Sequence, residues 1–181
     1  MQAELYWIEG PWPGRLAIMP RPRGGDWLEE EAASWRRMGI GVVVSTLTKE
    51  EISELDLAGE EEVCAVSKIY FVAFPIEDRS IPPSRKATLE LVRRLEQELA
   101  LGKKIAIHCR QGVGRSALLA ACVLAASGVD PASAWKRIAA ARGCTVPDTS
   151  EQREWVMRFV PDRLAPHTAK LRELGTNSDA P

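Results

Sequence analysis

The alternation of apolar and polar positions along the chain predicts strands and helices in turn. Short apolar runs, rich in β-branched residues and bounded by turn signals, are typical of buried strands. We expect such strands over residues 5–8, 15–19, 40–45, 69–74 and 104–108. Apolar residues at helical spacing, as at Leu89, Val92, Leu95 and Leu99, mark the helices between them. We expect helices over residues 27–38, 84–102, 114–127, from Asp130-Pro131 onward, and over 149–160.

Helix boundaries can also be located from capping residues. Asp26 is placed to cap the helix over 27–38, and Gly39 to end it. Thr48 and Glu51 have the spacing of a capping box that opens a further short helix. Strands that alternate with helices indicate an α/β fold, a central and mostly parallel sheet flanked by helices. We expect one domain over residues 1–165 and a polar C-terminal tail over 166–181.

Composition narrows the possible partners and location. Of the 181 residues, 24 are basic and 25 acidic, so no net field favours nucleic acid or an anionic membrane. No apolar run approaches the ~20 residues of a membrane span. The N-terminal residues lack a basic segment followed by an apolar one, so we expect no signal peptide and a cytoplasmic location. The four cysteines form no CxxC pair, which predicts free thiols and no metal site. Cys64, Cys122 and Cys144 are expected to fill space in the interior.

The remaining cysteine lies where chemistry is expected. "KIAIH-CRQGVGRS-ALLAACVLAA" runs from a strand through a glycine-bearing loop into a helix, and ligands bind at this kind of junction in parallel sheets. Inward N–H groups and the helix dipole would form an anion pocket that stabilises the thiolate of Cys109. Arg115 adds a planar fork suited to two phosphoryl oxygens, and Ser116 a hydroxyl near the sulfur. The alternative is a tight turn around a buried cysteine that binds a phosphate of some nucleotide.

Two further segments bear groups that a phosphate-ester cleavage would need. "FPIEDRSIPP" presents Glu77 and Asp78 on a proline-stiffened loop after a strand, where a carboxylic acid can protonate a leaving oxygen. The alternative is a solvated acidic pair in a surface turn. Gln152, in "PDTSEQ", can orient a water molecule. Its spacing from Thr149 is equally that of a helix cap.

Together these segments resemble a known family. His108 to Ser116, "HCRQGVGRS", resembles the signature loop of the cysteine-dependent protein tyrosine phosphatase superfamily, and the small size resembles its dual-specificity branch. In "FPIEDRSIP", Asp78 stands four residues before a proline and matches the general-acid aspartate of that branch better than Glu77. "TSEQ" is similar to the late glutamine segment of compact members.

The resemblance implies a metal-free, cofactor-free reaction in two displacements. Cys109 would attack phosphorus, with Arg115 and the loop amides holding the phosphoryl group. Asp78 would protonate the leaving group and then accept a proton from water. Ser116 would ease departure of the thiolate, Gln152 would place the water, and His108 would hold the loop and tune the thiolate. The loop amides concerned are those of Arg110, Gln111, Gly112, Val113, Gly114 and Arg115.

The expected function is therefore a phosphomonoester hydrolase acting on phosphoproteins, with phosphotyrosine and also phosphoserine or phosphothreonine as substrates. Among the variable loop positions only Arg110 is charged, and lipid phosphatases of the family that the loop resembles often carry more basic residues there, so an inositol phospholipid is less favoured. It is kept, with other small phosphates, as the alternative, because Arg110 could attract a polyanionic substrate. Two further classes are a non-catalytic phosphate-binding module and a thiol-redox or sulfur-transfer enzyme. The partner expected is a phosphorylated protein. The sequence indicates no oligomeric state.

Overall fold

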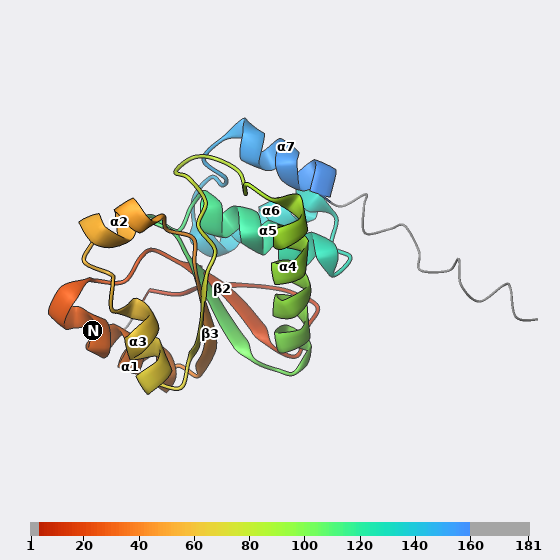
Figure 1. The fold of residues 1–181 in the computed structure, drawn as a ribbon. Coiled ribbons are helices and arrows are strands. Elements are labelled where there is room, and N and C mark those ends of the chain that lie inside the picture. The colour runs from red at the N-terminus through yellow and green to blue at the C-terminus, as the bar shows by residue number, and fades with distance from the viewer. Residues whose placement is uncertain (1–3, 160–181) are drawn as a thin grey trace, which may run out of the picture.

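Five strands form one twisted sheet at the centre of the molecule (Figure 1), in a computed structural model that describes residues 4–159. Their order across the sheet is β1-β2-β5-β3-β4, with β1 antiparallel to β2 and all other neighbours parallel. The bounds are β1 Tyr6–Ile8, β2 Arg15–Met19, β3 Ile40–Ser45, β4 Tyr70–Ala73 and β5 Lys104–His108. The predicted α/β class with a mostly parallel sheet is confirmed.

Helices cover both faces of the sheet (Figure 1). Helices α1 and α3 pack on one face, and α4, α5 and α6 on the other, with α7 against α5. The bounds are α1 Leu28–Arg37, α2 Lys49–Glu54, α3 Glu60–Val66, α4 Arg85–Ala100, α5 Arg115–Ala126, α6 Pro131–Arg142 and α7 Ser150–Phe159, with a short 3-10 helix η1 Gly25–Trp27 before α1.

The pleat of the central strand explains this layering. In β5, Ile105 and Ile107 point into the core beneath α4 and α5, whereas Ala106 belongs to the smaller core beneath α1 and α3. Apolar residues on both faces are what a central parallel strand requires. Helix α5 is apolar around nearly its whole circumference, and all of its residues from Arg115 to Ala125 are buried.

The structure differs from the sequence-based expectations in two places. Asp26 does not cap α1, because it lies within η1 and the N-cap residue Trp27 makes no side-chain cap bond. Helix α3 was not predicted, since "EEEVCAV" begins with three glutamates and is too short to show helical periodicity. The predicted tail over 166–181 lies outside the described residues. Between residues 4 and 159, no helix is long and apolar enough to span a bilayer.

Candidate active site

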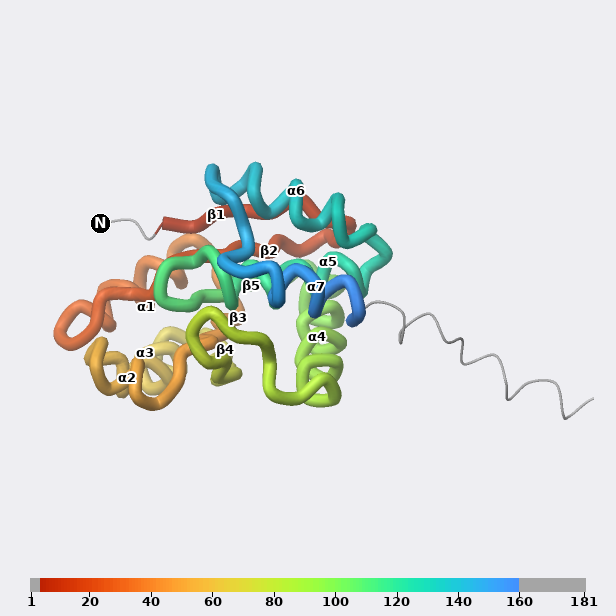
Figure 2. Tube along the Cα trace, turned by 90° about the horizontal axis from the view of Figure 1, so that it is seen from above, coloured from red at the N-terminus to blue at the C-terminus, as the bar shows by residue number. Residues whose placement is uncertain are grey.

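The carboxyl ends of three parallel strands bring the candidate site together. Ser45 pairs with His108 of β5 and with Ala73 of β4, so the loops that leave β3, β4 and β5 start side by side. Viewed from above (Figure 2), the loop before α5, the loop before α4 and the segment before α7 lie around one spot. Residues far apart in the sequence therefore meet at the edge of the sheet where ligands bind in such folds.

The phosphate loop, residues 109–115, wraps around the thiol. Cys109 is buried, its Sγ accepts a hydrogen bond from the N–H of Gly112 at 3.2 Å, and the Ser116 Oγ lies 3.4 Å away. Gly112 has φ +69, and a Cβ there would lie 2.7 Å from the backbone of Met19, so only glycine fits. Arg142 donates to the carbonyls of Gln111 at 3.2 Å and Gly112 at 3.1 Å, which fixes the orientation of these peptides.

Arg115 is the most extensively bonded side chain of the site. It is only 2% exposed, and its guanidinium donates to both carboxylate oxygens of Glu51, at 2.6 and 2.8 Å, and to the carbonyl of Ile76 at 2.9 Å. Burial alone would lower the pKa of Arg115, but the bonds to Glu51 and the charge of Cys109 outweigh it and raise that pKa. Burial would likewise raise the pKa of Glu51, but the hydrogen bonds from Arg115 and from the N–H of Thr48 lower it.

Glu51 is the site residue that sequence reasoning missed. The predicted capping box is present, with the Thr48 N–H donating to Glu51 Oε2 at 3.0 Å and the Glu51 N–H donating to Thr48 Oγ1. The same carboxylate also anchors Arg115. In the sequence, the capping box is a sufficient explanation for a glutamate at position 51. Nothing in the sequence links Glu51 to Arg115, which lies 64 residues later.

Asp78 lies over the phosphate loop. Its Oδ1 is 3.0 Å from Arg115 Nη2, and its side chain is 62% exposed. Asp78 is among the residues that line the pocket around Cys109, whereas Glu77 is not. The structure thus brings Asp78, Arg115 and Cys109 together, whereas Glu77 is exposed and does not line the pocket.

Gln152 does not line that pocket. Its side chain is fully buried, and its Nε2 donates at 2.9 Å to the carbonyl of Ser80, on the loop that carries Asp78. Thr149 caps α7 by accepting from the Gln152 N–H at 3.2 Å, but the glutamine side chain does not return to complete a capping box. Gln152 therefore ties the start of α7 to the loop after β4.

Nine residues from four segments line the pocket around Cys109, which has a volume of about 380 Å³. They are Asp78, Arg79, Cys109, Arg110, Gln111, Val113, Arg115, Arg142 and Asp148. Asp148 is a second carboxylate that sequence reasoning missed. Its Oδ2 would lie 1.9 Å from a Cβ built on Gly114, so it rests directly against the phosphate loop.

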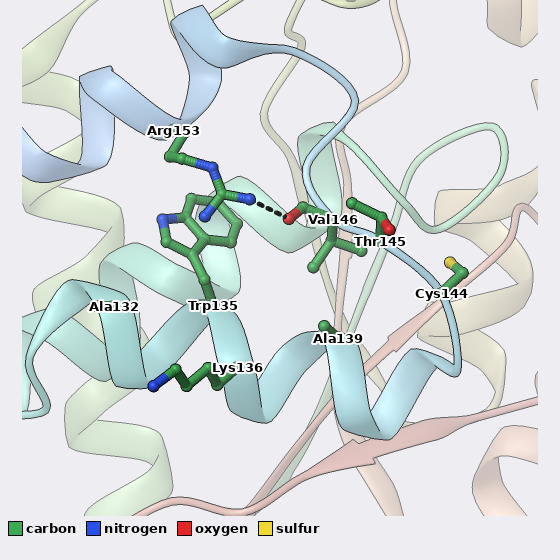
Figure 3. Close-up of a pocket in the computed structure, with 8 residues that line it drawn as sticks. All are labelled: Ala132, Trp135, Lys136, Ala139, Cys144, Thr145, Val146 and Arg153. Carbon is green, nitrogen blue, oxygen red and sulfur yellow. Dashed lines mark hydrogen bonds between the residues drawn. The ribbon is translucent and has the colours of Figure 1, made fainter.

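A larger hollow of about 570 Å³ lies between α6 and the segment before α7 (Figure 3). It contains neither Cys109 nor Arg115 among its lining residues. There the Arg153 guanidinium lies 5.5 Å from the Trp135 ring and donates to the carbonyl of Val146 at 2.8 Å. Arg153 thus fixes the segment that begins at Val146, and this segment places Asp148 against the phosphate loop.

The other cysteines differ from Cys109 in their surroundings. Burial, together with the charges of Glu60 and Glu61, raises the pKa of Cys64 to about 12. Burial also raises the pKa of Cys122. Both fill space in the core, as expected, whereas the expectation for Cys144 is wrong, because its side chain is exposed.

Comparison with known proteins agrees with this geometry. Residues 3–158 match the family model of the "Swiss Army Knife protein, DSP-PTPase phosphatase domain". The chain belongs to this family. It is thus a phosphatase domain of the dual-specificity type within the cysteine-dependent protein tyrosine phosphatase superfamily. The resemblance identified from the sequence motifs is confirmed.

Individual relatives of this dual-specificity-type domain are distant. Cyclin-dependent kinase inhibitor 3 of Sus scrofa is 28% identical over 149 residues, which cover 81% of this chain and 69% of the relative. The solved structure of Tk-PTP in its active form is 27% identical, with a TM-score of 0.72 over 91% of this chain and 100% of that one. Kinase-associated phosphatase, solved with a serine in place of its catalytic-site cysteine, has a TM-score of 0.80 at 20% identity, over 92% and 98% of the two chains. The last likeness shows the fold alone.

Proposed function

We propose that this phosphatase domain hydrolyses phosphomonoesters of proteins without a metal ion, through a phosphocysteine intermediate at Cys109. The observation that carries the proposal is the convergence of three groups on one pocket. The buried thiol of Cys109 accepts a hydrogen bond from a backbone N–H, and the buried guanidinium of Arg115 lines the same pocket. The Asp78 carboxyl lies 3.0 Å from that guanidinium. These are a nucleophile, an anion clamp and an acid in one place.

In the first displacement, the Cys109 thiolate attacks phosphorus, the S–P bond forms and the P–O bond to the leaving group breaks. The phosphoryl oxygens are held by the N–H groups of the phosphate loop and by Arg115, so charge is stabilised where it develops. Asp78 gives its proton to the departing oxygen. Its contact with Arg115 yields to the incoming dianion, which leaves the carboxyl free to face the leaving group.

In the second displacement, a water molecule attacks the phosphocysteine. Asp78, now ionised, accepts a proton from that water, the new P–O bond forms and the S–P bond breaks. Ser116, whose Oγ lies 3.4 Å from the sulfur, donates to the departing thiolate. Gln152 keeps the Asp78 loop in place through Ser80, and so supports this step by positioning the base.

The pocket favours a protein substrate. A hollow of about 380 Å³, lined by residues from four segments, has room for a phosphoryl group and for part of the side chain that bears it, which supports phosphotyrosine and the shorter phosphoserine or phosphothreonine as substrates. The pocket is also lined by three further arginines, Arg79, Arg110 and Arg142. Two of them already have partners in the protein: Arg110 forms an ion pair with Glu54, and Arg142 donates hydrogen bonds to carbonyls of the phosphate loop. This leaves fewer free cations than a polyphosphorylated inositol headgroup would require.

The test is hydrolysis of p-nitrophenyl phosphate in excess EDTA by the wild type, by Cys109→Ser and by the control Cys144→Ser. Cys144 is exposed and does not line the catalytic pocket, so its variant should keep full activity while Cys109→Ser loses it. Phosphopeptides and phosphoinositides compared by kcat/KM then define the substrate class. Activity retained by Cys109→Ser, or phosphopeptide binding without turnover by the wild type, would contradict the proposal.

A further inference from the structure

A buried ion pair lies immediately before the nucleophile. His108 Nε2 is 2.9 Å from Glu60 Oε1, and the two side chains are 0% and 2% exposed. Glu60 is the first residue of α3, and His108 is the last residue of β5, one position before Cys109. Such completely buried charge pairs are uncommon, because removing both groups from water costs several kcal/mol per ion.

The pleat of β5 places His108 on this side of the sheet. His108 has the same parity as Ala106, which faces the core beneath α1 and α3. The His108 carbonyl accepts from the N–H of Thr46 at 3.0 Å and from Thr46 Oγ1 at 2.9 Å, so the backbone that enters the phosphate loop is fixed as well. The imidazole and the start of the loop are therefore held as one unit.

Glu60 and His108 depend on each other for neutralisation. Among residues 4–159, neither side chain makes a hydrogen bond, and the 2.9 Å approach of His108 Nε2 to Glu60 Oε1 is the only polar contact that the structure describes for them. A buried carboxylate without a positive partner is strongly disfavoured. A positively charged imidazole beside the Glu60 carboxylate would leave the buried pair with no net charge. With a neutral imidazole and an ionised Glu60, an uncompensated negative charge would lie behind the thiolate.

We infer that Glu60 is a positioning residue which keeps His108 protonated and thereby sustains the negative charge of the Cys109 thiolate. An imidazolium one residue before the sulfur favours the thiolate, as a cation beside a cysteine generally does. The inference deepens the proposed function and rests on it. The field of Glu60 reaches its surroundings, since Glu60 contributes to the raised pKa of Cys64 one turn along α3.

Other charged groups around the pair and the thiolate lie on two sides. On α3 the charged group is Glu61, which together with Glu60 contributes to the raised pKa of the neutral Cys64 thiol. On the pocket side, Arg115 interacts with the charge of Cys109 and is itself paired with Glu51 and Asp78. None of these pocket residues contacts Glu60, so substitution of Glu60 leaves the anion clamp intact.

The test is the pH dependence of Cys109 alkylation by iodoacetamide, followed by peptide mass spectrometry between about pH 5 and pH 8. It compares the wild type with Glu60→Gln and with the control Glu62→Gln, an exposed carboxylate on the same helix. We expect Glu60→Gln to slow alkylation near pH 6 by about tenfold and to move the profile to higher pH by about one unit. Glu62→Gln should match the wild type. In a His108→Asn background, Glu60→Gln should produce no further change.

Identical profiles for Glu60→Gln and the wild type would overturn the inference. If Glu60→Gln fails to fold, ¹⁵N NMR of the wild-type imidazole decides. The His108 nitrogens must show the imidazolium signature at neutral pH, and a neutral imidazole would refute the role. Alkylation requires no turnover. A Glu60-dependent profile in a protein that fails to hydrolyse p-nitrophenyl phosphate would therefore reject the proposed function while leaving the positioning role standing.

Discussion

Glu51→Gln is expected to weaken both the fold and the catalysis, because it removes the charge that compensates a buried guanidinium. Arg115 is 2% exposed and gives two hydrogen bonds to Glu51. Removal of one partner of a buried pair typically costs about 3–5 kcal/mol. Asp78 and the carbonyl of Ile76 remain on the guanidinium, so we expect the lower end, about 3 kcal/mol. The value of kcat/KM should fall by about a hundredfold, because a displaced Arg115 guanidinium no longer lies in the position from which it binds the phosphoryl oxygens.

Urea unfolding of the wild type, Glu51→Gln and the exposed control Glu50→Gln measures this difference, with an unchanged m-value showing that the unfolded state is the same. The pH dependence gives a second check. The pKa of Glu51 is lowered in the fold, so its contribution is complete above the ordinary carboxyl value of about 4.3 and is lost as the pH falls through the lower folded value. The stability gap should therefore close only below about pH 4. A gap under about 1 kcal/mol at neutral pH, or one that persists unchanged into strong acid, would refute the reasoning.

Three further outcomes follow from the site. Asp78→Asn should lower kcat/KM, which reports only the first displacement, by about 10²–10⁴-fold for alkyl phosphates and flatten the alkaline limb of its pH profile, yet lower kcat/KM much less for p-nitrophenyl phosphate, whose leaving group needs little protonation; equal losses of kcat/KM on both substrates would disprove the acid role. Iodoacetamide at neutral pH should modify Cys109 and spare Cys64, whose pKa burial raises to about 12, and Cys122; peptide mapping shows this, and modification of the buried pair at a similar rate would contradict it. Gly112→Ala should lower the melting temperature and abolish phosphate protection of the thiol, because its φ of +69 and the 2.7 Å approach to the β2 backbone leave no room for a Cβ; an alanine variant that binds phosphate normally would show that the loop can adjust.

Local patterns were sufficient for most of the fold. Each of the five strands was predicted from its own apolar run, and α4 from the spacing of Leu89 to Leu99, because burial of these residues depends on the period of the element that carries them. Helix α3 was missed because only Glu60 and Cys64 of its residues are buried, which is too few for a period to be visible.

The site was predictable where its residues form a contiguous motif and not where they meet only through the fold. The loop from His108 to Ser116 carries its own signal. Glu51, Glu60 and Asp148 come from other segments, and each has an ordinary local explanation as a cap, a helix start or a turn residue. Their roles depend on contacts across the sheet edge, namely to Arg115, to His108 and to the backbone at Gly114. These contacts depend on the pairing register of the parallel strands, which local sequence patterns do not reveal.

The central claim, that the sulfur of Cys109 takes the phosphoryl group, is tested most directly by rapid acid quench of the wild-type protein during turnover, followed by mass spectrometry of its peptides. The account predicts that the peptide containing Cys109 carries one phosphoryl group in the steady state, and that Cys109→Ser, incubated with the same substrate, carries none at that residue. Full turnover with every cysteine-containing peptide unmodified, at a time resolution faster than kcat, would contradict it.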